Sequence, residues 1–473
     1  MRVVLFGTGN FYRLYCGWFQ QHEIVALLDN NTGKQGEILD GVRIESPSSV
    51  RSLAFDHIFI LCYDFMPIWE QLRTLGVAES KIHSYRRIIG ILGSTVPAAL
   101  MQNRPPFVFQ QPRGKRILVI THNFRITGAE TVLLTALDIL VSAGYEAIVV
   151  AEKDGPIRAA YEQHGLRCFV DETLRINDLD HVRWLQALQP DLIILNTVFI
   201  YQLLHAYHLS IPVVWWLHDP EMLYRSNPVQ FLPADPWPDV HIYAVSKLGR
   251  TPFLQRLPAW NVGVLPFGIA DTCPVQTEIP THLARLHIAV VGMLCKVKNT
   301  LGLYQALRLV PKEIRQHLQV RMIYQNQNEK EISDYQAAAE DLPEIVFAGR
   351  FDQQGMHGVY EQCDVLLCPS KEECMPTVAV EAMMHGRPCI VTRQCGVTDY
   401  LHDRQDSILT DADPAELAAA ITWAWRHRAQ LHELGRQARH TYEETFALDS
   451  FAQKLLRIIR QYLSKREDDP CQV

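Results

Sequence analysis

The sequence lacks the marks of membrane, disulfide-rich and nucleic-acid-binding proteins. It has no unbroken run of the roughly 18–20 apolar residues that a membrane helix requires, since its most apolar candidate, 192–200, is interrupted by Asn196 and Thr197. Its 11 cysteines are an odd number without a Cys-x-x-Cys spacing, which argues against a complete disulfide framework and a zinc knuckle. Lys and Arg (45) are outnumbered by Asp and Glu (52), so the net charge of −7 gives no general affinity for nucleic acid.

The composition is that of a globular α/β protein. Of the 473 residues 48% are hydrophobic and 21% are charged, and at roughly 150 residues per domain this length favours about three domains. Residues 1–7 form a short apolar run that ends at a glycine, unlike a signal peptide. We therefore expect a soluble, cytoplasmic protein with reduced cysteine thiols.

Short apolar runs alternate with glycine turns and helical segments, a pattern that predicts parallel sheets covered by helices. The expected strands are Val3–Phe6, Ile24–Leu28, Ile58–Cys62, Ile117–Thr121, Ala147–Ala151, Leu192–Leu195, Val213–Leu217, Ile242–Val245, Ile288–Val291, Val320–Tyr324, Val346–Ala348, Val365–Cys368 and Cys389–Val391.

Two proline-rich breaks, at 103–114 and 269–282, divide the chain because prolines end helices and strands and mark linkers. An apolar stripe at helical spacing over 450–463 adds a C-terminal helix. The predicted units are an N-terminal Rossmann-like domain (1–111), two further Rossmann-like domains (112–278 and 279–447) and a helix (448–473) that packs back on the body.

The first domain begins as dinucleotide-binding folds begin. A strand leads into Gly7-Thr8-Gly9, and Asp29 follows about twenty residues later, where such folds place a ribose-binding carboxylate. Tyr12 replaces the third glycine and crowds the contact between helix and strand. Two interpretations stay open: an NAD site, or a Rossmann-like fold with a degenerate pocket. Residues 24–31 and 41–44 also resemble small Rossmann-like domains fused to bacterial sugar-modifying enzymes, which suggests a sugar-nucleotide or regulatory module.

Residues 81–116 carry seven Lys or Arg and no Asp or Glu, against the negative charge of the whole chain. This pattern is typical of contact with an anionic lipid surface, here the inner membrane, or with a lipid-linked diphosphate acceptor. A basic linker between two domains has the same pattern.

The second domain also opens with a strand and a glycine turn. Residues 117–121 lead to Thr127-Gly128-Ala129-Glu130, where a helix is expected to begin. Free N–H groups and the positive end of the helix dipole make such a helix start suitable for an anion.

Two carboxylates flank a second helix start, near Thr377. Glu373 precedes it, and Glu381 lies in its second turn among apolar residues, where an unpaired carboxylate is costly. Carboxylates so placed can accept hydrogen bonds from two sets of hydroxyls, such as a sugar and a ribose, while the helix start between them suits a diphosphate. Helix capping by Glu373 and a surface position for Glu381 is the alternative.

Several motifs resemble the retaining family-4 glycosyltransferases of the GT-B fold. The most specific is Glu373-x7-Glu381-Ala382-Met383 with Gly386-Arg387-Pro388, and its flanks (Pro369-Ser370 and 396–400) are similar to a branch found in bacterial cell-surface polysaccharide synthesis. Thr127–Glu130 resembles that family's Gly-Gly-x-Glu loop with Thr127 for the first glycine, and 211–219 resembles its acceptor-side strand, which ends in a histidine. The resemblance implies two facing Rossmann-like domains, here preceded by a third.

The resemblance also implies roles for individual residues. Three are catalytic: Glu373 contacts the donor-sugar hydroxyls, Lys298 neutralises the diphosphate, and His218 lies at the reaction centre. Glu381 binds the ribose hydroxyls. The donor-binding set is completed by Thr127, Gly128, Gly292, Lys296, Cys374, Met375, Thr377 and Val378.

The sequence departs from the family pattern at two places. Met293 stands where an arginine is expected. Either Lys296 replaces the charge of that arginine, or the leaving diphosphate is less well stabilised. Tyr324-Gln325-Asn326-Gln327 replaces an expected glycine turn, which affects base recognition. The pairs Asp178-x-Asp180 and Asp411-x-Asp413 have metal-ligand spacing but do not suitably follow strands, and Asp413 is expected to cap a helix, so no metal is predicted.

The predicted activity is therefore metal-independent transfer of a sugar, with retention, from a nucleoside-diphosphate donor (a UDP-sugar is favoured) to a glycan or lipid-linked acceptor. The nucleotide sugar is a co-substrate, and no other cofactor is expected. Two alternatives stay open: a non-catalytic glycosyltransferase-like subunit that binds a partner enzyme, and a sugar-nucleotide 2-epimerase.

Overall fold

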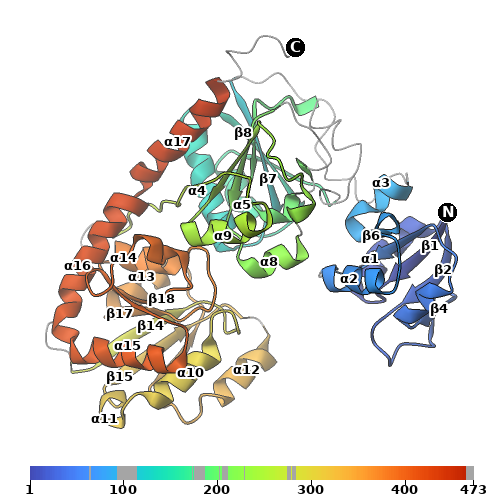
Figure 1. Cartoon of the computed structure of the whole chain (residues 1–473). Helices are drawn as coiled ribbons and strands as arrows, with labels where there is room; N and C mark the ends of the chain where they lie inside the picture. Colours follow the sequence, from blue (N-terminus) through green and yellow to red (C-terminus); the bar gives the residue numbers. More distant parts are fainter. Residues whose placement is uncertain are drawn as a thin grey trace.

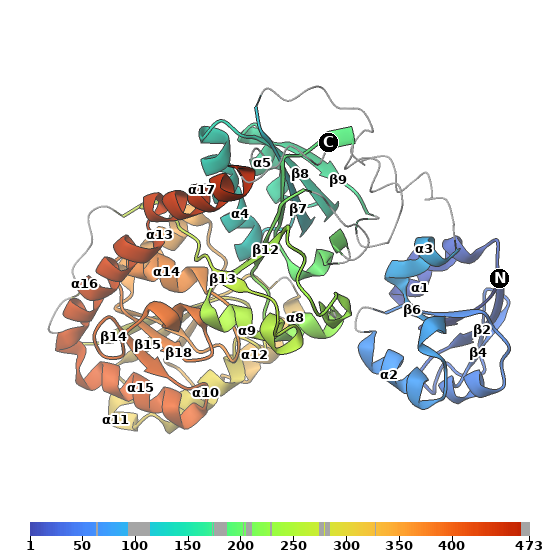
Figure 2. The same cartoon turned by 45° about the horizontal axis from the view of Figure 1, so that its top comes forward.

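The computed structural model describes residues 1–62, 65–92, 114–172, 174, 187–201, 203–204, 211–227, 229–273, 279, 284–326 and 328–464. Its strands form three sheets, each with its own helices (Figures 1 and 2). The predicted boundaries near 111 and 278, most of the basic segment 81–116 and the pair Asp178-x-Asp180 lie outside the described residues.

The first sheet has the strand order β3-β4-β2-β1-β5-β6, and only the β3–β4 pair is antiparallel. Its strands are β1 (Arg2–Phe6), β2 (Glu23–Leu28), β3 (Ile38–Leu39), β4 (Val42–Glu45), β5 (His57–Ile60) and β6 (Ile82–Ser84). Its helices are α1 (Asn10–Tyr15), α2 (Met66–Thr74) and α3 (Ile88–Leu92). Val3 and Leu5 pack on one face, and Val4 and Phe6 on the other, so the unbroken apolar run of β1 is buried on both faces.

The second sheet is parallel, with the order β13-β12-β11-β10-β7-β8-β9. Its strands are β7 (Arg116–Asn123), β8 (Glu146–Lys153), β9 (Arg167–Val170), β10 (Leu192–Leu195), β11 (Val213–Leu217), β12 (Val240–Ala244) and β13 (Val262–Val264). Its described helices are α4 (Gly128–Ser142), α5 (Ile157–Gln163), α8 (Glu221–Ser226) and α9 (Lys247–Arg256).

The third sheet is also parallel, with the order β16-β15-β14-β17-β18-β19. Its strands are β14 (Leu286–Val291), β15 (Leu318–Ile323), β16 (Ile345–Gly349), β17 (Val365–Cys368), β18 (Cys389–Thr392) and β19 (Ser407–Thr410). Its helices are α10 (Thr300–Leu309), α11 (Lys312–Arg315), α12 (Glu329–Ala337), α13 (Gln353–Gln362), α14 (Thr377–Met384), α15 (Pro414–Arg426) and α16 (Leu431–Thr441). Asp413 caps α15 by accepting a 2.8 Å hydrogen bond from the Ala415 N–H.

The chain returns from the third unit to the second through α17 (Leu448–Ser464), the red helix that lies along the second unit in Figure 1. Phe451 stacks on Trp216 with ring centroids 5.6 Å apart. The chain first passes from the second unit to the third between β13 and β14, and Ile269 lies in that segment. Ile269 pairs with Ala447, just before α17, and the Ile269 N–H donates to the Phe446 carbonyl at 3.0 Å. The two crossings between these units therefore lie side by side.

All the strands expected from apolar runs are present, with ends shifted by no more than two residues. The strands β3, β4, β6, β9, β13 and β19 were not among them. Five of the six are edge strands, which pair on one side only and carry short or weakly apolar sequences. None of the helices in the described part of the chain has the length and hydropathy that a membrane crossing requires.

We expect Phe451→Ala to lower the free energy of unfolding by about 3–5 kcal/mol, because the ring is fully buried between α17 and the second unit. Urea denaturation followed by tryptophan fluorescence measures the loss. Gln453→Ala, on the exposed side of the same helix, is the matched control and should change stability by less than about 0.5 kcal/mol. Equal effects of the two substitutions would show that α17 does not dock through this ring.

Candidate functional site

A cavity of about 480 Å³ lies between the second and third units. It is lined by the start of α4, the segment after β11, the loop after β14 and the start of α14. Ten of the predicted site residues line it: Thr127, Gly128, His218, Gly292, Lys298, Glu373, Cys374, Met375, Thr377 and Val378. Lys296 is exposed and, like Glu381, is not part of the lining.

Two helix N-termini face each other across this cavity. α4 begins at Gly128 and α14 at Thr377, and a Cβ added to Gly128 would lie 3.5 Å from Cγ2 of Thr377. Thr127 and Pro376 precede the two helices in extended conformations, and neither caps its helix through a side chain. Because both helix dipoles and their free N–H groups point toward one space, that space is suited to an anion.

The Thr127 hydroxyl is held by a buried carboxylate. It donates to Oε2 of Glu130, and the Thr121 hydroxyl donates to Oε1 of the same carboxylate at 3.3 Å. Glu130 is fully buried, and this burial raises the pKa of its carboxyl despite the two hydrogen bonds. Glu130 therefore fixes the conformation of the loop that starts α4.

Lys298 and Glu373 form the central ion pair of the cavity. Nζ of Lys298 lies 2.5 Å from Oε1 of Glu373, while Oε2 of Glu373 accepts a 2.9 Å hydrogen bond from Ser370. Burial lowers the pKa of Lys298, but the nearby carboxylate of Glu373 outweighs this effect and the pKa is raised overall. The lysine is therefore charged at neutral pH.

Gly292 makes room for this lysine. Its φ is +145°, and a Cβ built on it would lie 3.4 Å from Cε of Lys298. A side chain at position 292 would thus be strained by the backbone conformation and would touch the Lys298 stem. This requirement explains the glycine at the end of β14.

His218 follows β11 and reaches the cavity. Its Nε2 atom is buried and has no hydrogen-bond partner among the described residues, and its ring meets Trp216 edge-on at 4.5 Å. Burial lowers the pKa of the imidazole to about 3. His218 is therefore neutral at physiological pH and can offer or accept one hydrogen bond.

Asp219, beside His218, has a role that the sequence reasoning missed. Its buried carboxylate accepts hydrogen bonds from the Thr197 hydroxyl at 2.9 Å and the Val198 N–H at 2.7 Å. Burial raises the pKa of Asp219 to about 6. Asp219 ties the end of β11 to the turn after β10, and its position next to a histidine at a strand end was the available signal.

Glu381 lies in the second turn of α14 and is bonded to the protein itself. Its Oε2 accepts a 2.5 Å hydrogen bond from the hydroxyl of Tyr360, a buried residue of α13. Burial raises the pKa of Glu381, and the hydrogen bond from Tyr360 partly offsets this. The expectation that its carboxylate would not lie unpaired in apolar surroundings is met by Tyr360, which the sequence did not single out.

Asn326 stands in the segment where a glycine turn was expected and holds the neighbouring loop. Its Oδ1 accepts from the Leu294 N–H at 2.8 Å, and its Nδ2 donates to the Leu294 carbonyl at 3.1 Å. Met293, in place of the expected arginine, is 54% exposed and lines the cavity. The loop after β14 is thus fixed by an amide side chain.

Contacts close to Glu373 join the two units. The Ser246 hydroxyl donates to the Cys374 carbonyl at 2.8 Å, and Asp399 accepts from the Lys247 N–H at 2.5 Å at the start of α9. Gly396 lies between these contacts, where an added Cβ would come within 1.9 Å of the Cys374 carbonyl oxygen. The position of the Glu373 loop therefore depends on the contact between the units.

The glycine turn of the first unit has its own carboxylate partner. Asp29 accepts from the Thr8 N–H at 3.1 Å, the Thr8 hydroxyl at 2.5 Å and the Asn31 N–H at 2.9 Å. Tyr12 is buried and its hydroxyl donates to Asp40 at 2.9 Å. Asp29 is thus bonded to the glycine turn itself, and both interpretations of this pocket stay open.

One group within the described residues has the composition and spacing of metal ligands: Cys368, Glu373 and Cys395. Asp413 is engaged as a helix cap.

Three regions of the chain match models of protein families. Residues 285–427 match glycosyl transferases group 1, residues 113–235 match glycosyl-transferase family 4, and residues 1–83 match a C2185-like N-terminal domain. The two glycosyltransferase models thus match regions within the two units that enclose the cavity.

Relatives and a solved structure agree with these regions. The chain is 29% identical over 115 residues to the D-rhamnosyltransferase WbpZ of Pseudomonas aeruginosa, covering 24% of this chain and 30% of that protein. It is 23% identical over 261 residues to the lipopolysaccharide 1,2-N-acetylglucosaminetransferase of Salmonella typhimurium, covering 50% and 66%. The crystal structure of Anabaena Alr3699/HepE in complex with UDP-glucose superposes with a TM-score of 0.60 at 18% identity, covering 74% of this chain and all of that one. The two facing units thus have the GT-B fold, as predicted.

His218 provides a test of the site by pH. Because the unfolded imidazole takes up a proton near pH 6.5 and the folded one only near pH 3, the unfolded state binds more protons between these values. The contribution of His218 to stability is therefore lost as the pH falls below 6.5. We expect the free energy of unfolding to decrease less between pH 6.5 and 4 in His218→Gln than in the unmodified protein.

Urea denaturation at several pH values measures this difference. His440→Gln is the control, because that side chain is 62% exposed. Asp219, with its raised pKa, acts in the opposite sense in both proteins and cancels in the comparison. Parallel pH profiles for unmodified protein and His218→Gln would contradict the burial of a neutral imidazole.

Proposed function

We propose that the protein is a glycosyltransferase that moves a sugar from a nucleoside-diphosphate donor, a UDP-sugar by preference, to a glycan or lipid-linked acceptor. One observation carries the proposal: Lys298 and the N-termini of two facing helices point into one cavity that Glu373 also lines. Positive charge for a diphosphate and a carboxylate for sugar hydroxyls are the two recognition elements that such a donor needs.

The chemistry follows from where charge develops. Breaking the glycosyl–phosphate bond leaves negative charge on the diphosphate, which Lys298 and the start of α14 stabilise in place of a metal ion. Donor hydroxyls compete with Lys298 for the Glu373 carboxylate, so that binding releases the ammonium toward the phosphates. Glu381 binds the ribose when its side chain turns away from the Tyr360 hydroxyl. Neutral His218 binds the reacting sugar or the acceptor.

Transfer with retention is the stereochemistry that we propose. Only Glu372 and Glu373 supply carboxylates among the described lining residues. Glu372 accepts from the Glu221 N–H, and Glu373 is held by Lys298 and Ser370, so neither is placed as a covalent nucleophile. A same-face displacement, in which the leaving diphosphate takes the acceptor proton, needs no such nucleophile.

We propose that the protein acts in cell-surface polysaccharide synthesis. It does so in the cytoplasm, where residues 81–116 contact the inner membrane. The lipopolysaccharide transferase of Salmonella typhimurium that the chain matches supports the proposed process.

A thermal-shift panel of UDP, GDP, dTDP, ADP, CDP and NAD tests the donor site. We expect UDP to stabilise the protein, by roughly 2.7 kcal/mol at 100 times its dissociation constant, and Glu381→Ala to lose most of that response. A response to no nucleoside diphosphate would favour a non-catalytic subunit, and a response to NAD alone would place the function in the first unit. Donor turnover without any acceptor would favour a 2-epimerase.

Lys298→Ala should lower kcat about 10²–10³-fold, because one charged group at the leaving diphosphate is lost. Donor consumption measured as released nucleoside diphosphate gives the rate, and Lys330→Ala, at an exposed lysine of α12 outside the cavity lining, is the control. Lys296→Ala should have a smaller effect, since Lys296 is exposed outside the lining. Chelation by EDTA should leave the rate unchanged, and a rate restored only by added Mg²⁺ would contradict the role of Lys298.

A further inference from the structure

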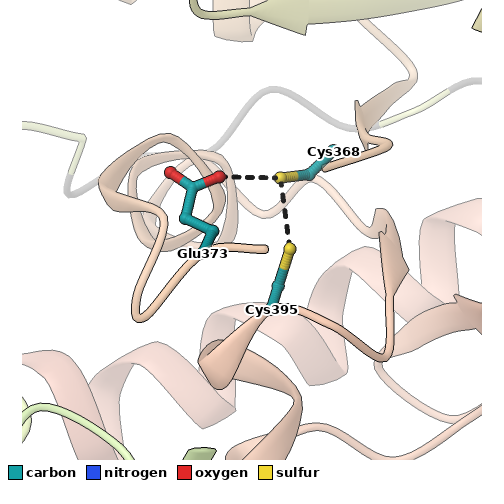
Figure 3. Close-up of side chains that lie close together, drawn as sticks. All are labelled: Cys368, Glu373 and Cys395. Carbon is teal, nitrogen blue, oxygen red and sulfur yellow. Dashed lines mark hydrogen bonds between the residues drawn. The ribbon is translucent and has the colours of Figure 1, made fainter. Parts of the chain in front are cut away.

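Three side chains meet behind the Glu373 loop, as Figure 3 shows. Cys368 ends β17, Glu373 lies in the loop before α14, and Cys395 lies in the turn after β18. The two Sγ atoms are 3.8 Å apart, and Sγ of Cys368 lies 3.8 Å from Oε2 of Glu373. One ligand atom from each residue lies within 4.8 Å of the other two.

The backbone fixes this arrangement. β17 and β18 are adjacent parallel strands, and Glu373 forms a bridge with Cys395. The Glu373 N–H donates to the Gln394 carbonyl at 3.1 Å, and the Gly396 N–H donates to the Glu373 carbonyl at 2.8 Å. Both thiols are buried, so their spacing does not depend on freely rotating side chains.

The spacing is that of ligands around a tetrahedral ion. With a zinc–sulfur distance of about 2.3 Å, two thiolates at the tetrahedral angle lie about 3.8 Å apart, and a thiolate and a carboxylate oxygen about 3.5 Å apart. The distance of 3.8 Å between the two Sγ atoms matches the first value. The distance of 3.8 Å between Sγ of Cys368 and Oε2 of Glu373 is close to the second. Two sulfurs and one oxygen are also a donor set that favours zinc and its thiophilic analogues over magnesium.

We propose that Cys368, Cys395 and Glu373 form a binding site for a thiophilic divalent cation such as Zn²⁺, and that its occupation inhibits the protein. The ion binds two thiolates and Oε2 of Glu373, with water from the adjoining cavity as the fourth ligand. The two thiol protons pass to solvent, and nothing is oxidised or reduced. The inhibitory part rests on the proposed function, because it depends on withdrawing Glu373 from the donor sugar.

The surroundings support the ligands. The Ser370 hydroxyl donates to Oε2 of Glu373 at 2.9 Å, and the Thr392 hydroxyl lies 3.4 Å from Sγ of Cys395. Lys298 holds the other oxygen, Oε1, so it leaves Oε2 accessible while its charge opposes a second cation. The site is therefore weakened by the lysine that the transfer reaction requires.

Titration with Co²⁺ of the reduced full-length protein tests binding without any turnover. We expect one equivalent to produce the intense visible and near-ultraviolet bands of tetrahedral cobalt thiolate, and Zn²⁺ to abolish them. Cys368→Ser and Cys395→Ser should each lose these bands, whereas Cys389→Ser, a buried cysteine of the neighbouring strand, should retain them. Ser370→Ala should weaken binding about 10–100-fold, and Lys298→Met should strengthen it.

Circular dichroism of each variant establishes that it is folded. Absence of cobalt bands in the unmodified protein, or identical bands in folded Cys395→Ser, would overturn the proposed ion site. A mass loss of two hydrogens on the Cys368–Cys395 pair without bound metal would overturn it in favour of a disulfide. UDP thermal shifts on the same samples separate the two proposals: cobalt bands without a UDP response leave the ion site standing and contradict the donor site.

Discussion

The ion pair between Lys298 and Glu373 is the interaction on which the rest of the site depends. It joins the loop after β14 to the loop before α14, and the lysine stem lies against Gly292. The two partners have opposite charges and neutralise each other in this structure. A charged lysine kept near the start of α14 by a carboxylate is thus a pre-organised anion site that does not bear an unpaired charge.

The surrounding groups hold this pair in place without adding charge. Asn326 bonds both backbone groups of Leu294, Glu130 binds the hydroxyl of Thr127, and Asp219 ties the segment that carries His218. Two of these groups are buried carboxyls whose pKa values are raised, so their hydrogen bonds position loops more than they contribute negative potential. The cavity therefore keeps the positive field of its two helix starts.

The sequence predicted the fold better than the details of the site. Unbroken apolar runs such as 192–195 identify buried parallel strands. The Glu373-x7-Glu381 block located the start of α14, so the GT-B fold could be predicted from the sequence. Three contacts could not be predicted: the Lys298–Glu373 ion pair, the Tyr360–Glu381 hydrogen bond and the short distance between Cys368 and Cys395. Each joins residues from different loops, whose distance in space has no periodic signal in one sequence, and Tyr360 looks like any aromatic residue of a helix.

The crossing where Ile269 meets Ala447 limits the ways in which the two units can move. Two chain segments that pass between rigid bodies at one place, and are bonded to each other there, act as a single pivot. Translation of one unit past the other would break the Ile269–Phe446 bond, whereas a small rotation about this crossing preserves it. Phe267, two residues before this crossing, lines the cavity, so a rotation at the crossing changes the shape of the cavity. The C-terminal helix thus belongs mechanically to the second unit although the chain reaches it from the third.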